Sequence, residues 1–332
     1  MDIHVSPQIE RLIRDSLDED IGAGDLATMA TISAESHGTG LFRAKKEGVV
    51  AGLVLLDRIF YFIDHRVELR LRTKDGAQVT PGMVVAEAIG PVRALLLAER
   101  TALNFLQRLS GNATLTRKYV EAVKDFPCKV LDTRKTTPGL RTLEKYAVRM
   151  GGGMNHRIGL YDAALVKDNH IEATGSIGEA VKAVRRHAPF MAKVEVEASS
   201  LKQVQEAIDA GADVIMLDNM TLAQMAEAVK AVRRHAPFMA KVEVEASSLK
   251  QVQEAIDAGA DVIMLDNMTL AQMAEAVKLV NKRAWVEASG GITLETIRQV
   301  AATGVDFISS GALTHSAPVV DFNMKITMNV EK

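Results

Sequence analysis

Charged side chains end several short apolar runs from about residue 130 onward. Arg134 and Lys135 end the run in KVLDTRKT, Lys167 falls late in AALVKDNH, and Glu197 and Asp218 end AKVEVE and DVIMLD. A strand buried on both faces of a parallel sheet is nearly all apolar, so these polar ends need a reason. In α/β barrels, polar groups at the carboxyl ends of strands converge on the catalytic mouth. Each residue alone could be a solvated strand end or part of a structural ion pair, but together they predict an enzyme site.

Cationic side chains follow the first two of these runs. They are Arg134, Lys135, Arg141, His156, Arg157 and Lys167. Guanidinium groups pair with carboxylate or phosphate through two parallel hydrogen bonds, so such a cluster indicates a ligand with several negative charges. GGGMN precedes His156 and Arg157, and three consecutive glycines suit close backbone approach or a tight bend. The alternative for these two residues is a charged loop.

Two glycine-rich turns, in ASGGIT and SSGALTHS, follow the last two apolar runs. Turns of this kind offer the N–H groups of a helix N-terminus to phosphate, and barrels commonly bind phosphate after their last two strands. Glu197 and Asp218 could hold Mg²⁺ beside a phosphorylated ligand, because this ion favours one or two carboxylates plus substrate oxygens. A single cysteine and scattered histidines argue against zinc. We therefore expect a barrel enzyme that acts on a phosphorylated, polyanionic substrate.

The composition excludes several other classes of protein. The chain has 332 residues, of which 48% are hydrophobic and 25% charged, and its net charge is −2. These values are ordinary for a soluble globular protein and provide no field that attracts nucleic acid or a membrane surface. Cys128 is the only cysteine, which excludes an internal disulfide and favours a reducing compartment. Without a signal-peptide core or a membrane-length apolar run, the chain is expected to be cytoplasmic.

The predicted pattern of helices and strands that positions these strand ends changes near residue 113. Residues 1–112 predict an α+β domain in which a long helix, VRALLLAERTALNFLQRLSG, ends near Gly111. Residues 113–317 alternate short apolar runs with helical patterns, which favours an α/β barrel of parallel strands, although a doubly wound sheet has similar periodicity. Residues 318–332 alternate again and are expected to pack back on the first domain.

The barrel region contains an identical repeat. Residues 179–226 recur as residues 227–274 without one change, and the identity continues to Lys278. Each copy holds two strand–helix units, and the junction joins equivalent points of two helices. One copy fewer would leave 284 residues (332 less 48) and six barrel strands, whereas both copies together give eight. Ordinary repeats drift apart, so perfect identity favours an engineered duplication over a natural one.

Several long motifs together resemble one protein family. DTRKTTPGLR, KYAVRMGGGMNHRIGLYDAALVKDNH, KVEVEASSL, GADVIMLDN, GVDFISSGALTH and ERTALNFLQRLSG are similar to quinolinate phosphoribosyltransferase, the carboxylating nicotinate-nucleotide pyrophosphorylase of NAD biosynthesis. The resemblance covers nearly the whole chain and departs from the family only at the repeat. It implies an N-terminal α/β sandwich on a partly open six-stranded barrel, in a homodimer. It also implies the Mg²⁺-dependent reaction of quinolinate with phosphoribosyl pyrophosphate, which gives nicotinate mononucleotide, pyrophosphate and CO₂.

The resemblance further implies roles for individual residues. Binders of the two quinolinate carboxylates would be Arg134, His156, Arg157 and Lys167, with Arg100 contributed by the partner subunit. Contacts to phosphoribosyl pyrophosphate would come from Lys135 and from a 5′-phosphate pocket made by Ser289, Gly290, Gly311 and His315. The acidic pair near the ribose and metal would be Glu197 and Asp218, or their duplicates Glu245 and Asp266.

Two arrangements of the repeat compete. Extruding one copy from a six-stranded barrel would expose the apolar faces of VIML, VQEAI and MAEAV. Inserting all the strands satisfies their edges and reaches the eight-strand closure of barrels. We therefore predict a closed eight-stranded barrel in which phosphoribosyltransferase activity is weak or absent, because two added strands separate Lys167 from Ser289. In such a wall, Glu197 would neighbour Lys167, and Asp266 would neighbour the phosphate loops.

Two other functions remain open at the level of sequence. One is a Schiff-base barrel aldolase that uses Lys167. The other is an engineered scaffold, made to test barrel expansion and lacking activity. The second copy could also exchange between protomers, which would produce higher oligomers.

Overall fold

The chain forms two compact units that interleave along the sequence. The computed structural model describes residues 5–162, 164–188, 192–217, 220–235 and 241–328, so Asp218 lies outside the described residues. The first unit comprises residues 1–120, 135–155 and 311–332, and the second comprises residues 121–134 and 156–310. Within the described ranges, no helix has both the length and the apolar character needed to cross a membrane.

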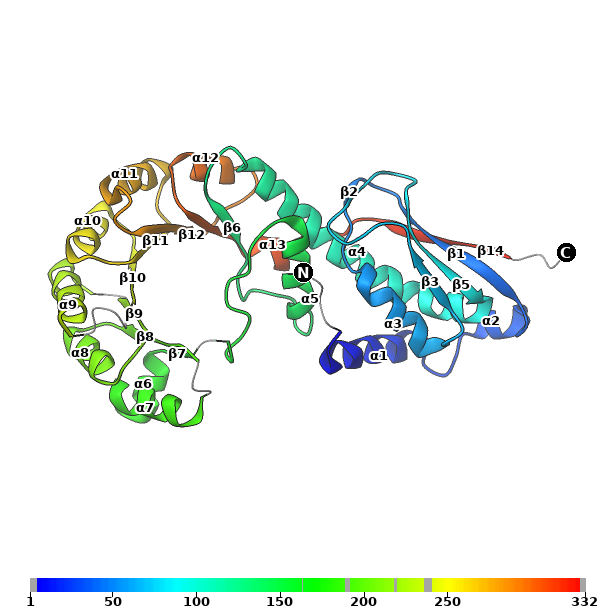
Figure 1. Cartoon of the computed structure of the whole chain (residues 1–332), viewed down its shortest axis with the longest axis horizontal. Coiled ribbons are helices and arrows are strands. Elements are labelled where there is room, and N and C mark those ends of the chain that lie inside the picture. Colours follow the sequence, from blue (N-terminus) through cyan, green and yellow to red (C-terminus); the bar gives the residue numbers. More distant parts are fainter. Residues whose placement is uncertain (1–4, 163, 189–191, 218–219, 236–240, 329–332) are drawn as a thin grey trace. The chain divides into compact units, whose positions relative to one another are not determined.

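The first unit is built on an antiparallel sheet (Figure 1). The strands of this unit are β1 (His37–Ala44), β2 (Gly48–Val49), β3 (Glu68–Leu71), β4 (Gln78–Val79), β5 (Val84–Pro91) and β14 (Phe322–Met328). Of these, β2 and β4 pair in a small sheet of their own. The helices of this unit are α1 (Pro7–Ile21), α2 (Leu26–Thr31), α3 (Leu53–Ile63), α4 (Val92–Ala122), α5 (Arg141–Gly151) and α13 (Ala312–His315). The four main strands have the order β14–β1–β5–β3, so the last strand of the chain pairs with the first.

Local sequence explains these elements well. The hydroxyl of Ser6 caps α1 by accepting a hydrogen bond from the N–H of Ile9, and Pro7 occupies the first helical position, where its missing N–H costs nothing. Ile9, Ile13 and Leu17 recur at helical spacing and are buried. They join a core that includes side chains of α3, α4 and the sheet.

The long helix α4 was predicted to end near Gly111, and this prediction is wrong. It continues to Ala122. A Cβ atom at position 111 would lie 2.0 Å from the carbonyl oxygen of Pro318, so only glycine permits this backbone approach. Gly111 is therefore a packing glycine rather than a helix stop, and a single sequence does not distinguish the two.

The second unit is an eight-stranded parallel sheet with helices along its outer side (Figure 1). Its strands are β6 (Lys129–Leu131), β7 (Ala164–Val166), β8 (Val194–Ala198), β9 (Val214–Leu217), β10 (Lys241–Ala246), β11 (Val262–Asp266), β12 (Trp285–Ser289) and β13 (Phe307–Ser309). Its helices are α6 (Asp168–Thr174), α7 (Ile177–His187), α8 (Leu201–Asp209), α9 (Leu222–His235), α10 (Leu249–Ala258), α11 (Leu270–Val280) and α12 (Ile297–Ala302).

Both copies of the repeat lie in the wall, which confirms the prediction of an α/β barrel with eight strands. The strand order is β6–β13–β12–β11–β10–β9–β8–β7. The prediction of a closed barrel is wrong, because β6 and β7 are the two ends of this order and do not pair within the described residues. The added strands enter the middle of the wall. They lengthen it without supplying a partner to either edge.

The two copies use the same clamp at the amino ends of their strands. In the first copy, Asp213 accepts hydrogen bonds from Arg185 and from the N–H of Val194, both at 2.7 Å. In the second, Asp261 accepts from Arg233 at 2.7 Å and from the N–H of Val242 at 2.9 Å. Each copy thus carries its own helix-to-strand anchor, which explains how a duplicated segment fits into the wall.

Candidate active site

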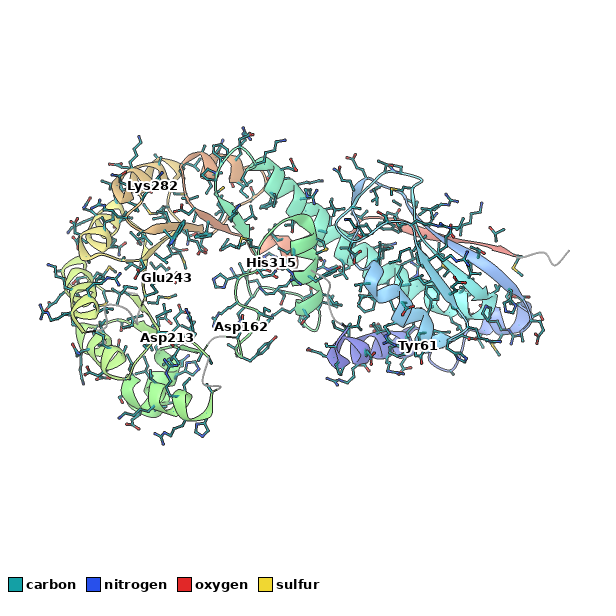
Figure 2. The ribbon with its side chains drawn as sticks, viewed as in Figure 1. Tyr61, Asp162, Asp213, Glu243, Lys282 and His315 are labelled. Carbon is teal, nitrogen blue, oxygen red and sulfur yellow. The ribbon has the colours of Figure 1, made fainter. Side chains whose placement is uncertain are left out.

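The inner face of the second sheet is lined by acidic side chains. Val194, Val196 and Ala198 of β8 are fully buried toward the helices, and the alternation of a strand places Glu195 and Glu197 on the opposite, inner face. β10 repeats the pattern and places Glu243 there as well (Figure 2). Helices cover the outer face, so a ligand reaches this sheet from its inner face or from the ends of its strands.

Three of the predicted cationic residues lie around Glu195. Burial raises the pKa of the Glu195 carboxyl, and attraction by Arg157, His156 and Lys167 opposes that rise. The ammonium group of Lys167 forms an ion pair with Glu197, with 3.0 Å between Nζ and Oε2. The Lys167 side chain is 47% exposed, so the pair adds little stability and leaves the ammonium accessible to a ligand.

The chain at His156 and Arg157 is held by a buried carboxylate. Asp132, which follows β6 and is fully buried, accepts a hydrogen bond from the N–H of His156 at 2.9 Å. The N–H of Arg157 donates to Nδ1 of His156 at 2.8 Å. Nη1 of Arg157 is buried and has no acceptor among the described residues, as expected of a donor that awaits an anionic ligand.

Asp132 and Glu195 belong to this group but were not among the residues predicted for the site. Asp132 directly follows an apolar run in KVLDTRKT, and this position carried a usable signal. Glu195 lay in a recognised alternating pattern, but nothing in that pattern indicates that three cations surround it. Arg134, another of the predicted carboxylate binders, is half-buried and lies two residues beyond Asp132 in the chain.

The first glycine-rich turn lies beside the second copy of the repeat. Asp266 is paired in register with Ser289 on the neighbouring strand. A Cβ atom at Gly290 would lie 2.3 Å from Oδ1 of Asn267 and 3.3 Å from Oδ1 of Asp266, so only glycine fits this turn. Glu197 therefore accompanies Lys167 while Asp266 accompanies the turn, as predicted for an eight-stranded wall.

Strand register shows that the two copies meet different neighbours. Glu197 is level with Met216 and, one strand further, with Glu243. Glu245, the duplicate of Glu197, is level with Met264 and then with Glu287. Glu287 is buried and accepts a hydrogen bond from the hydroxyl of Ser309 at 2.5 Å. The two identical acidic strands thus serve different parts of the wall.

In the first unit, three predicted phosphate ligands come together. A Cβ atom at Gly311 would lie 3.0 Å from Nε2 of His315 and 3.2 Å from Cδ of Lys135. The hydroxyl of Thr314 donates to the carbonyl of Lys135 at 2.6 Å, which ties the two segments together. Arg100 is exposed on α4. Arg141 begins α5 and donates from Nε to the hydroxyl of Thr136 at 3.0 Å.

One pair of carboxylates suited to a metal ion lies on neighbouring strands of the wall. Glu245 and Asp266 end the neighbouring strands β10 and β11, on the inner face. Among the residues with defined positions, no three histidine, cysteine, aspartate or glutamate side chains gather closely enough to hold a metal by themselves. Paired carboxylates match the needs of Mg²⁺, which takes its remaining ligands from phosphate oxygens and water.

Models of one protein family match both parts of the chain. A family model for the N-terminal domain of quinolinate phosphoribosyl transferase matches residues 25–110. The corresponding C-terminal domain model matches twice, over residues 112–235 and 222–325, and each match contains one complete copy of the repeat. The chain belongs to the quinolinate phosphoribosyltransferase family.

Relatives within the quinolinate phosphoribosyltransferase family match almost end to end. A probable carboxylating nicotinate-nucleotide pyrophosphorylase from Synechocystis is 41% identical over 97% of this chain and 93% of its own length. The Bacillus subtilis protein of the same description is 41% identical over 98% of this chain and 95% of its own length. The crystal structure of NadC from Streptococcus pyogenes has a TM-score of 0.70 and 40% identity, and covers 99% of both chains.

Proposed function

We propose that this protein transfers a phosphoribosyl group from phosphoribosyl pyrophosphate to quinolinate and releases pyrophosphate and CO₂, at a rate reduced by the repeat. The observation that carries the proposal is the group of Arg157, His156 and Lys167 around Glu195. Three cationic side chains at one end of the wall suit a ring that bears two carboxylates. The curated relatives named for this reaction support the same conclusion.

The side chains supply binding and electrostatic stabilisation. Arg134, Arg157, His156 and Lys167 would hold the two carboxylates, and the buried Nη1 of Arg157 would gain an acceptor. Holding the ring fixes its nitrogen for attack on C1 of the ribose. A bond forms from that nitrogen to C1 as the bond from C1 to pyrophosphate breaks, and the electron pair leaves with pyrophosphate.

Positive charge grows on the ribose as pyrophosphate departs. Carboxylates fixed near C1 stabilise that charge more than they stabilise the ground state, a role for Glu245 and Asp266 or for Glu197 and Asp218. Loss of CO₂ then leaves an electron pair on the ring carbon, which takes up a proton from water. Lys167 belongs to the cationic group that would hold the quinolinate ring, so its positive charge could stabilise this carbanion.

The acidic pair would also hold the metal ion. Glu245 and Asp266, or Glu197 and Asp218, are suited to Mg²⁺, which would neutralise part of the charge of the pyrophosphate group. On the phosphate side, Ser289, Gly290, Gly311, His315 and Lys135 would bind the remaining groups of phosphoribosyl pyrophosphate. The protein would act as a homodimer in which an exposed Arg100 reaches the site of the partner.

The repeat lengthens the path along the wall between the two substrate groups. Lys167 follows β7 and Ser289 ends β12, five strand spacings apart in the sheet order. A wall with one copy has three such spacings, so the repeat adds about 10 Å along the wall at roughly 4.8 Å per strand. Since errors of one ångström already cost large rate factors, turnover should be low while quinolinate binding persists. Identity over 48 residues supports a recent, deliberate duplication.

Quinolinate binding to the full chain tests the proposal directly. Titration calorimetry should detect binding, and Lys167→Ala should weaken it by about tenfold or more, because each lost charge-assisted hydrogen bond is worth roughly 1.5–3 kcal/mol. Lys182→Ala is the matched control, since Lys182 is exposed on α7 and pairs with Glu179 at 3.2 Å. Binding that Lys167→Ala leaves unchanged would remove Lys167 from the site, and absence of binding by the unaltered chain would overturn the proposal.

A further inference from the structure

A pocket lies at the amino end of the parallel sheet, at the opposite end of the strands from the candidate active site. Its volume is about 680 Å³, a size typical of small-molecule sites. Its walls include Lys241, Asp261, Val262, Lys282, Arg283 and Trp285. Trp285 begins β12 and Ser289 ends it, so roughly 13 Å of strand separates this pocket from the glycine-rich turn. The pocket is therefore distinct from the candidate active site.

One wall of the pocket is an exposed aromatic ring. Trp285 is 57% exposed, although the rest of its strand is largely buried. The ring of Phe307 lies against it, with centroids 5.7 Å apart and planes tilted by 53°. Phe307 thus fixes the indole from one side. Val262 on β11, which is paired in register with Trp285, extends the apolar surface. A planar ring packed on this surface would gain aromatic contact beyond the apolar area that it buries.

The charged groups of the pocket leave an excess of positive charge. Burial raises the pKa of Asp261, but hydrogen bonds from the N–H of Val242 and from Arg233 and Lys241 outweigh it and lower that pKa overall. Asp261 is therefore an anion whose charge two cations neutralise, at 2.7 and 3.0 Å. Asp306 accepts a hydrogen bond from the N–H of Val286 at 2.8 Å, a neutral group, so its carboxylate is the remaining negative charge of the pocket.

Two further cations, Lys282 and Arg283, directly follow α11, and together they outweigh the one remaining carboxylate of the pocket, that of Asp306. Lys282 is labelled in Figure 2. Arg283 donates to the carbonyl oxygens of Val280 and Leu279, at 3.2 and 2.6 Å, and these carry no full charge. In the part of the chain with defined positions, Lys282 forms no ion pair. An anion beside the indole would meet both side chains.

The repeat provides an internal comparison for this pocket. Lys193, Asp213 and Val214 of the first copy correspond to Lys241, Asp261 and Val262 of the second. Val214 is paired in register with Lys241, whereas Val262 is paired with Trp285. The first copy therefore meets a lysine where the second meets an aromatic ring. The same three residues border the aromatic pocket only where they lie beside β12.

We propose that this pocket binds an aromatic anion, with a planar ring stacked on Trp285 and a carboxylate, sulfonate or phosphate group held by Lys282 and Arg283. The apolar wall supplies stacking area, and the two cations select for negative charge. The site uses none of the residues assigned to phosphoribosyl transfer. Its occupancy is therefore independent of that proposed function.

The single tryptophan of the chain makes the test direct, because all indole fluorescence comes from Trp285. Anilinonaphthalene sulfonate is a suitable aromatic anion. It should quench the indole in a saturable manner at one probe per chain, and added salt should weaken binding by screening the cations. Lys282→Glu should raise the dissociation constant by about tenfold or more, as expected when one attraction becomes a repulsion.

Lys202→Glu is the matched control, because this lysine is 88% exposed on α8 and changes the net charge by the same amount. The control should bind the probe as the unaltered chain does. Dialysis with Trp285→Phe, which keeps an aromatic ring in the strand, should show weakened binding without loss of the native circular dichroism. Quenching that does not saturate, or that Lys282→Glu leaves unchanged in a folded chain, would overturn the proposal.

Discussion

A chain without residues 227–274 is expected to form nicotinate mononucleotide at least about 100-fold faster than the full chain. The reason is the position of the repeat within the wall, between the strand that leads to Lys167 and the strand that ends at Ser289. Removing one copy brings Lys167 and Ser289 two strand spacings closer along the sheet and lets one acidic strand serve both. A steady-state assay with quinolinate and phosphoribosyl pyrophosphate measures the difference.

The full chain itself is the control for this comparison. Both proteins should show cooperative unfolding, so that a change in rate is not a change in the folded fraction. Because the copies are identical, deleting residues 179–226 gives the same chain as deleting residues 227–274. Equal turnover by the long and short chains would show that the wall tolerates the added strands, and it would refute the spacing argument.

Glu243→Gln should stabilise the protein by about 2–4 kcal/mol near pH 9 and have little effect near pH 4. Burial, followed by the nearby carboxylates of Glu195, Glu287 and Glu245, raises the pKa of Glu243 from 4.5 to about 8. The folded state therefore binds this proton more tightly than the unfolded state does. Stability falls as the pH rises from about 4.5 to about 8, and that loss persists at higher pH.

The amide of glutamine keeps the shape of the side chain and cannot ionise, so the variant should lose this part of the pH dependence. Urea unfolding at several pH values measures it. Glu195→Gln is a matched comparison, because the same residue in the same local sequence faces Arg157, His156 and Lys167. Its stabilisation should be smaller. A stability curve for Glu243→Gln that runs parallel to that of the unaltered chain would contradict the account.

Much of the fold could be predicted because its strands and helices have strong local patterns. All the apolar runs of the second unit became strands, and the alternation in VEVEA correctly placed its glutamates on one face. The errors arose where a residue type has two uses. Gly111 permits backbone contact with Pro318 within a helix that continues, and nothing nearby in the sequence reveals that contact. The prediction of a closed barrel was wrong for a similar reason, because no local pattern shows whether β6 pairs with β7 at the two ends of the sheet.

The candidate site was predicted only in part, because local patterns are visible in the sequence and contacts between distant residues are not. Charged strand ends are visible in the sequence, and Lys167 and Glu197 form the expected neighbours. The support given by Asp132 to the backbone of His156 joins residues 24 positions apart, which no local pattern encodes. The pocket at Trp285 likewise depends on which strand the second copy meets.

The sequence by itself determined the alternation of strands and helices, the face on which each glutamate lies and the identity of the two copies, whereas the entry of both copies into one wall was decided by the tertiary structure. Nothing in the sequence distinguishes Glu195 from Glu243, because both lie in the same VEVEA segment and have the same local propensities. Only the tertiary structure decided that Glu195 faces three cations while Glu243 faces other carboxylates. Electrostatic environment is set by neighbours across the sheet, and strand order rather than local sequence selects those neighbours.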